Sequence, residues 1–146
     1  MSLTYLLDTN IISEPLRPVP DQQVLERLKR HEEEMAIASV VWHELLFGSY
    51  RLPPSAKRSA IEQYLSEVVA PTIPILPYDD QAAQWHAAER ARLVAVGQTP
   101  PFADGQIAAI ARINHLILVT ANVTDFSVFE GLQVENWQNE NSITSS

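Results

Sequence analysis

The sequence predicts an α/β fold of three layers, in which a mainly parallel sheet of four to five strands is flanked by helices. Short apolar runs such as residues 3–7 and 116–119 have the length of buried strands. Between these runs lie apolar–polar patterns of about 10–15 residues, which suit helices that cross over a parallel sheet. The 146 residues fit one domain. We expect this domain over residues 1–137 and a polar, flexible tail over residues 138–146.

The strands are predicted from apolar runs that end at polar residues or prolines. Residues 3–7 form such a run before Asp8, and residues 35–38 form another before Ser39. Pro71 and Pro74 flank a third, which places it near an edge of the sheet. The expected strands cover residues 3–7, 35–38, 73–76, 116–119 and 132–135.

The helices are predicted from apolar spacing and from residues that begin helices. Prolines 15, 18 and 20 break the chain before Asp21, which is a plausible N-cap. Ser39 could cap the second helix, Ser55 follows two prolines at the start of the third, and acidic residues at 79 and 80 suit the first turn of the fourth. The expected helices cover residues 21–31, 39–50, 55–69, 79–96 and 102–113.

Composition excludes several classes of protein. The apolar content of 46% and charged content of 19% are those of an ordinary globular chain. The absence of cysteine excludes disulfides and thiolate metal sites and fits a reducing compartment. No apolar run approaches the ~20 residues that span a membrane, and the N-terminus lacks the features of a secretory signal. We therefore expect a cytoplasmic protein without a membrane anchor.

The net charge of −8 argues weakly against non-specific binding to nucleic acid. A polyanionic substrate would have to meet a local basic patch. Residues 27–30 and 51–58 each contain three basic residues. The alternative interpretation is that both clusters are solvated helix surface.

Four carboxylates lie either directly after predicted strands or within predicted helices. Asp8 ends the first apolar run, Glu44 lies inside the second helix, Asp104 lies in the first turn of the last helix, and Asp125 follows the fourth strand. Isolated acids in apolar surroundings are costly, because burial disfavours the charged form. Ligands gather at the carboxyl ends of parallel strands. Brought together there, the acids would suit Mg²⁺ or Mn²⁺, which prefer oxygen ligands.

Each acid could also have a purely structural role, without binding a metal ion. Asp8 or Thr9 could cap a short helix, and Asp104 could stabilise a helix N-terminus. Glu44 could face solvent on an amphipathic helix, and Asp125 could be a turn residue. Gly105 beside Asp104 weakens the helix, which capping alone does not require.

Together these segments, over roughly residues 3–137, resemble the PIN domain, a metal-dependent ribonuclease fold. The small size and the motif variants are similar to the VapC-type toxins of prokaryotic toxin–antitoxin pairs. The segments that carry the resemblance are Asp8-Thr9-Asn10, Glu44-Leu45-Leu46-Phe47-Gly48, Asp104-Gly105-Gln106-Ile107-Ala108-Ala109 and Thr120-Ala121-Asn122-Val123-Thr124-Asp125-Phe126.

The resemblance implies an endoribonuclease that uses Mg²⁺ or Mn²⁺. It also implies a homodimer and an antitoxin that blocks the site, with DNA bound only indirectly through the antitoxin. The implied metal and catalytic residues are Asp8, Glu44, Asp104 and Asp125. The implied supporting residues are Thr9, Asn10, Thr120 and Asn122.

Two rival functions remain. A phosphatase of the haloacid-dehalogenase type also begins with an acid after a strand, but it needs a second Asp where this chain has Asn10. A degenerate PIN-like domain could instead bind RNA or protein without cleaving. Metal-dependent RNA cleavage separates this module from the nuclease.

Overall fold

The computed structural model describes residues 2–138, which contain a five-stranded sheet with strand order β3-β2-β1-β4-β5. Every neighbouring pair of strands is parallel, which confirms the predicted sheet. The strands are β1 (Tyr5–Leu7), β2 (Met35–Ala38), β3 (Ile75–Leu76), β4 (Ile117–Val119) and β5 (Val134–Glu135). Except for Gln138, the tail expected over residues 138–146 lies outside the described residues.

All five predicted helical segments are present, together with shorter ones. The helices are α1 (Thr9–Ile12), α2 (Gln22–Arg30), α3 (Ser39–Tyr50), α4 (Ala56–Tyr64), α5 (Ala70–Thr72), α6 (Asp80–Ala95), α7 (Phe102–Ile113) and α8 (Val123–Phe126). A 3₁₀ turn, η1 (Glu14–Leu16), follows α1, and a π-helical segment, η2 (Leu65–Val69), joins α4 to α5. The sequence pattern did not predict η1 or α8, and it offered α1 only as the short helix that Asp8 or Thr9 could cap.

Two local expectations were wrong. Ser39 does not cap α3, because β2 runs directly into this helix: Ala38 is the N-cap residue, and its side chain makes no capping bond. The third strand does not begin at Ile73, because the helical path continues through η2 and α5 to Thr72 and leaves only Ile75–Leu76 in the sheet. Pro71 is tolerated there because it lies in the first turn of α5.

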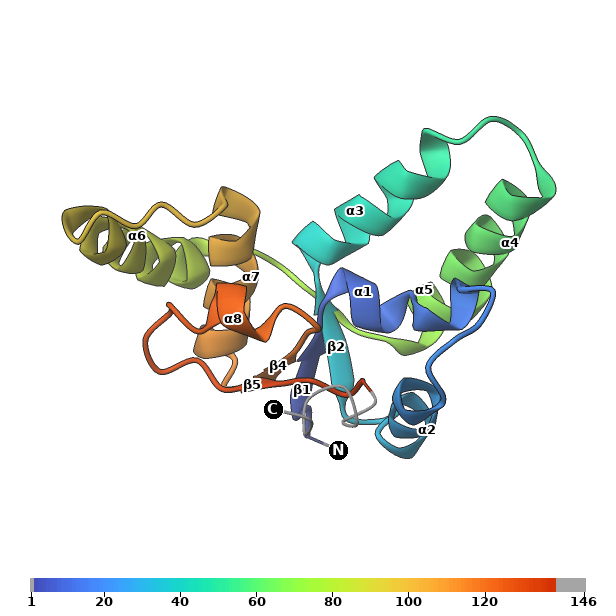
Figure 1. Cartoon of the computed structure of the whole chain (residues 1–146), viewed down its shortest axis with the longest axis horizontal. Helices are drawn as coiled ribbons and strands as arrows, with labels where there is room; N and C mark the ends of the chain where they lie inside the picture. Colours follow the sequence, from blue (N-terminus) through green and yellow to red (C-terminus); the bar gives the residue numbers. More distant parts are fainter. Residues whose placement is uncertain (1, 139–146) are drawn as a thin grey trace.

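The strands form the centre of the molecule. Leu6, Ile37 and Leu118 come from three neighbouring strands and are completely buried. Figure 1 shows α3 and α4 diverging from α6 and α7 on either side of these strands. Because the strands are parallel, the residues that follow β1, β2 and β4 emerge at one edge of the sheet, between the two pairs of helices.

No helix within residues 2–138 combines the length and the apolar character needed to cross a membrane.

Candidate active site

Asp8 lies directly after the central strand β1 and is 7% exposed. Its Oδ1 accepts a hydrogen bond of 2.8 Å from the Thr9 backbone N–H, and it is the N-cap residue of α1. Its Oδ2 accepts a bond of 2.8 Å from the Thr120 hydroxyl. Asp8 therefore does cap a short helix, as one interpretation of the sequence held. The same bonds also fix the carboxylate at the edge of the sheet, so capping does not exclude a ligand role.

The segment after β4 is tied to the segment after β1. Thr120 is completely buried, and its hydroxyl oxygen accepts a bond of 3.0 Å from the backbone N–H of Asn122. The side-chain oxygen of Asn10 accepts a bond of 3.3 Å from the backbone N–H of Ala121. Three of the four predicted supporting residues, Asn10, Thr120 and Asn122, therefore contribute to the network that joins these two strand ends.

Glu44 faces solvent on α3, as an amphipathic helix allows. Its Oε2 nevertheless accepts a hydrogen bond of 3.1 Å from the Thr9 hydroxyl. Thr9 thus contacts two predicted site residues, Asp8 through its backbone and Glu44 through its side chain. An exposed carboxylate held in this way can still reach a ligand at the edge of the sheet.

Asp104 is half-buried in the first turn of α7. It is not the N-cap residue, because Pro101 occupies that position. The pKa of Asp104 is raised to about 6. Burial is the largest cause, and the negative charges of Asp8, Asp125 and Glu44 contribute the rest of the rise, in that order. The four predicted acids, from four separate segments, therefore act on one another electrostatically. Asp125 itself is exposed in the first turn of α8.

The geometry limits how these acids could hold a cation. Within residues 2–138, no group of three His, Asp or Glu side chains is arranged to enclose a metal ion. The donors nonetheless suit a hard cation, because they are carboxylates whose mutual repulsion a positive charge would relieve. A cation at this edge would keep water among its ligands, as Mg²⁺ commonly does.

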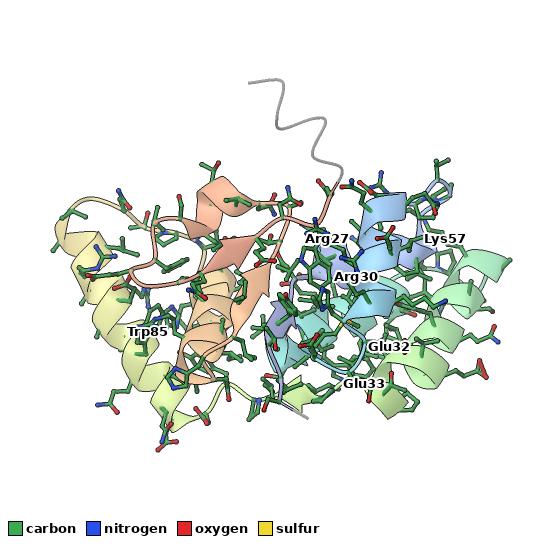
Figure 2. All side chains as sticks on the ribbon, turned by 90° about the horizontal axis from the view of Figure 1, so that it is seen from below. Arg27, Arg30, Glu32, Glu33, Lys57 and Trp85 are labelled. Carbon is green, nitrogen blue, oxygen red and sulfur yellow. The ribbon has the colours of Figure 1, made fainter. Side chains whose placement is uncertain are left out.

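The two basic clusters differ in their surroundings. Arg30 on α2 pairs with Glu26, and Figure 2 shows Arg27 and Arg30 on the helix that leads to Glu32 and Glu33. That end of α2 therefore carries both signs of charge. In the second cluster, Arg51 and Lys57 line a groove of about 520 Å³ that also contains Thr9 and Glu44. Neither of these two cations forms an ion pair with any residue between 2 and 138.

Sequence reasoning missed three buried titratable residues. Glu14 is completely buried and accepts a bond of 2.8 Å from the backbone N–H of Asp21, which holds the proline-rich segment before α2. Glu89 on α6 is held by Arg92, and the resulting hydrogen bond is the main cause that lowers the pKa of Glu89. Both glutamates stabilise loops and have partners outside the acid cluster. No local pattern marks either residue as buried.

His86 on α6 is the third of these buried residues. It is 4% exposed, and its Nδ1 lies 2.8 Å from the Tyr78 hydroxyl. Burial lowers the pKa of His86, and the nearby Arg90 lowers it further, so the ring is neutral at physiological pH. The four histidines form no metal site with other residues of the described chain.

The chain is similar to known proteins over nearly its whole length. The model of the PIN domain matches residues 5–131. The chain is 34% identical over 136 residues to the tRNA(fMet)-specific endonuclease VapC of Shigella flexneri. This alignment covers 92% of this chain and 98% of that protein. It is 33% identical over 124 residues to the toxin FitB of Neisseria gonorrhoeae, which covers 83% of this chain and 89% of that protein.

Solved structures agree with this similarity. The crystal structure of FitAcB from Neisseria gonorrhoeae matches with a TM-score of 0.83 and 32% identity, covering 91% of this chain and 97% of that chain. Other similar structures include VapBC complexes bound to DNA. This chain belongs to the PIN domain family.

Proposed function

We propose that this protein is a metal-dependent endoribonuclease and the toxin of a toxin–antitoxin pair. The observation that carries the proposal is the convergence of four acids from separate segments at one edge of the sheet, where hydrogen bonds hold Asp8 and Glu44 and the charges of the other three acids act on Asp104. Such a cluster is unfavourable without a cation and favourable with one. The relatives named as endonuclease and toxin support the same conclusion.

The cation in this proposal is Mg²⁺ or Mn²⁺. Asp8, Glu44, Asp104 and Asp125 would hold it, with water completing its ligands. Thr9, Asn10, Thr120 and Asn122 hold these acids or the backbone beside them and orient water. When bound, the cation supplies positive charge at the scissile phosphate and makes a bound water more acidic.

The remaining chemistry depends on how the protein's own groups are held. The bonds to Thr9 N–H and Thr120 Oγ1 fix both oxygens of Asp8, so this carboxylate needs little reorganisation when substrate binds. The Thr9 hydroxyl restrains Glu44, which is otherwise free in solvent. Positive charge nearby would favour the charged form of Asp104 and so oppose the rise in its pKa. Nucleophilic cysteine is excluded, because the chain has none.

The groove beside Glu44 provides a route for a polyanion in an acidic protein. Arg51 and Lys57 line it and are not neutralised by acids of the described chain. Phosphates of an RNA strand in this groove would lie near these two cations, which offset the negative charge of Glu44 beside them. Phe47 in the same groove is 58% exposed and offers apolar surface.

The same surface could also bind the two protein partners that we propose, an antitoxin and a second copy of the chain. An antitoxin segment with an apolar face could fill the groove, and a basic side chain on it would compete with the cation for the carboxylates. We also propose a homodimer, and DNA binding only indirectly through the antitoxin. Exposed apolar side chains such as Phe47 and Val68 leave surface for both contacts.

Cleavage of RNA by the purified chain tests the proposal. We expect cleavage with Mn²⁺ or Mg²⁺ and none with EDTA. Binding of RNA without cleavage under any divalent cation would support the alternative of a degenerate binding module. Cleavage in EDTA equal to that with metal would refute the mechanism.

A further inference from the structure

The edge of the His86 ring lies against the backbone of α7 at Gly105. A Cβ atom added at Gly105 would lie 2.1 Å from Nε2 of His86 and 2.6 Å from its Cδ2. Both distances are far below a normal contact, so only glycine allows the helix and the ring to approach this closely. Glycine inside a helix costs about 1 kcal/mol relative to alanine. The close contact with His86 explains why a weak helix former occupies this position.

The ring of His86 is held by its neighbours. Tyr78, which precedes α6, bonds to its Nδ1 at 2.8 Å, and the two rings meet edge to face with centroids 5.8 Å apart. The ring of Phe102 lies against His86 with centroids 4.7 Å apart. The guanidinium of Arg90 lies 5.2 Å from the centroid of the Phe102 ring. His86 is therefore a fixed support for α7 rather than a mobile side chain.

The first turn of α7 lacks the side-chain cap that begins α2, α4 and α6. Its N-cap residue is Pro101, and no side chain caps the helix. Asp104 and Gly105 are consecutive residues in this turn, and α6 makes its most extensive packing contact with α7. The contact between His86 and Gly105 therefore sets where the backbone of Asp104 lies.

We propose that His86 is a positioning residue for Asp104: its imidazole, held by Tyr78 and lying on Gly105, places the Asp104 carboxylate against Asp8 and so sets the affinity of the site for a divalent cation. His86 itself touches neither metal nor RNA in this proposal. The inference rests on the proposed function, because it assumes that the four acids hold a cation.

The experiment compares Mn²⁺ binding by electron paramagnetic resonance in five proteins: wild type, His86→Ala, Gly105→Ala, the double variant His86→Ala/Gly105→Ala, and Tyr78→Phe/His86→Phe. Loss of a group that orients metal ligands commonly weakens affinity about 10–100-fold. We expect His86→Ala to weaken Mn²⁺ binding about tenfold. Gly105→Ala should weaken it at least as much, because the added methyl collides with the ring.

Two double variants distinguish the effect of the contact between the ring and Gly105 from a general loss of folding stability. Removal of the ring removes the collision, so His86→Ala/Gly105→Ala should bind Mn²⁺ better than Gly105→Ala. Tyr78→Phe/His86→Phe keeps an aromatic ring against Gly105 and removes both partners of the hydrogen bond, so its Mn²⁺ affinity should stay within about threefold of wild type. Steady-state cleavage should follow the same order in kcat, with KM for RNA unchanged.

A matched control creates a cavity elsewhere in the same helix. Leu93→Ala removes a buried side chain from α6 and should lower Tm while leaving the Kd for Mn²⁺ unchanged. Equal weakening by Leu93→Ala and His86→Ala would overturn the proposal, since loss of stability alone would then explain the effect. Wild-type Mn²⁺ affinity in His86→Ala would overturn it as well.

If His86→Ala does not fold, Gly105→Ala and Tyr78→Phe/His86→Phe decide the matter. The first must weaken Mn²⁺ binding and the second must not; any other result refutes the inference. A wild-type protein that neither binds Mn²⁺ nor cleaves RNA would overturn the proposed function and this inference with it. If wild type binds Mn²⁺ and cleaves RNA, and the variants bind Mn²⁺ as tightly as wild type, this inference alone is overturned.

Discussion

The hydroxyl of Thr120 donates a hydrogen bond of 2.8 Å to Oδ2 of Asp8, across 112 residues of sequence. The same hydroxyl oxygen accepts the backbone N–H of Asn122. One buried side chain thus joins the ends of β1 and β4 and holds the turn that leads to Asp125. Thr120 therefore fixes an acid and a neighbouring backbone segment at once.

Thr120→Val tests this link with little change of shape. We expect RNA cleavage to fall about 10–100-fold, because Asp8 loses a bond that orients it. The N–H of Asn122 also loses its acceptor, so the variant should be less stable by about 1–3 kcal/mol. Activity assays and chemical denaturation measure the two effects. Thr120→Ser keeps the hydroxyl and should retain most activity, and Thr124→Val at an exposed position should match wild type.

Asp8→Asn tests the requirement for the cation. This substitution keeps the size of the side chain and removes its charge, so RNA cleavage should fall by several orders of magnitude. EDTA should abolish wild-type cleavage, and added Mn²⁺ should restore it. Asp80→Asn, an exposed substitution in the first turn of α6, serves as the matched control and should remain active. Full activity of Asp8→Asn would rule out the proposed chemistry.

The raised pKa of Asp104 predicts how stability depends on pH without metal. Its pKa rises from 3.8 to about 6 on folding, so the folded state favours the protonated form. The stability that this group contributes is present below about pH 4 and is lost as the pH rises through 6. Asp104→Asn cannot ionise and should have a higher Tm than wild type at pH 7, with no difference at pH 4.

Calorimetry across this pH range measures the effect. Saturating Mn²⁺ at pH 7 should reverse it, because the cation stabilises only the protein that retains the charged ligand. A constant difference in Tm from pH 4 to pH 7 would contradict the assignment of the shift to Asp104.

The exposed apolar surface predicts self-association. Phe47 is 58% exposed and Val68 is 47% exposed, and α4 has no buried residue in the isolated chain. We expect a homodimer in sedimentation at micromolar concentration, because association would cover part of this surface. A clean monomer would refute the dimer and leave the nuclease proposal unaffected.

Much of the fold could be predicted because its signals are local. Met35 to Ala38 is apolar throughout, and all four residues are buried in β2. Asp21 and Asp79 cap the helices that they were expected to begin. The four-residue helices α1 and α8 are too short to show a helical period, so α8 was not predicted and α1 was only one of two interpretations of Asp8. The path through η2 into α5 was not expected, because Pro71 suggested a break in the helix, whereas it lies in the first turn of α5, where proline is tolerated.

The site was predictable in part for the same reason. Asp8 follows a buried strand, so its position at the edge of the sheet can be inferred from topology alone. Nothing local shows that Glu44 reaches Thr9, or that burial is the main cause of the raised pKa of Asp104. His86 was beyond sequence reasoning, since a single histidine in an alanine-rich helix does not show which backbone it will contact. The metal and catalytic roles of the four acids stay predictions.

The order of the acids along the chain has a consequence for synthesis on the ribosome. Asp8 emerges first, whereas Thr120 and Asp125 are among the last residues of the domain to be added. Because β1 pairs with β4, the sheet edge that carries Asp8 is incomplete until residue 119 has been made. A nascent or prematurely terminated chain therefore lacks the full cluster. On the proposed function, each copy of the protein could therefore cleave RNA only after its own synthesis has passed residue 125.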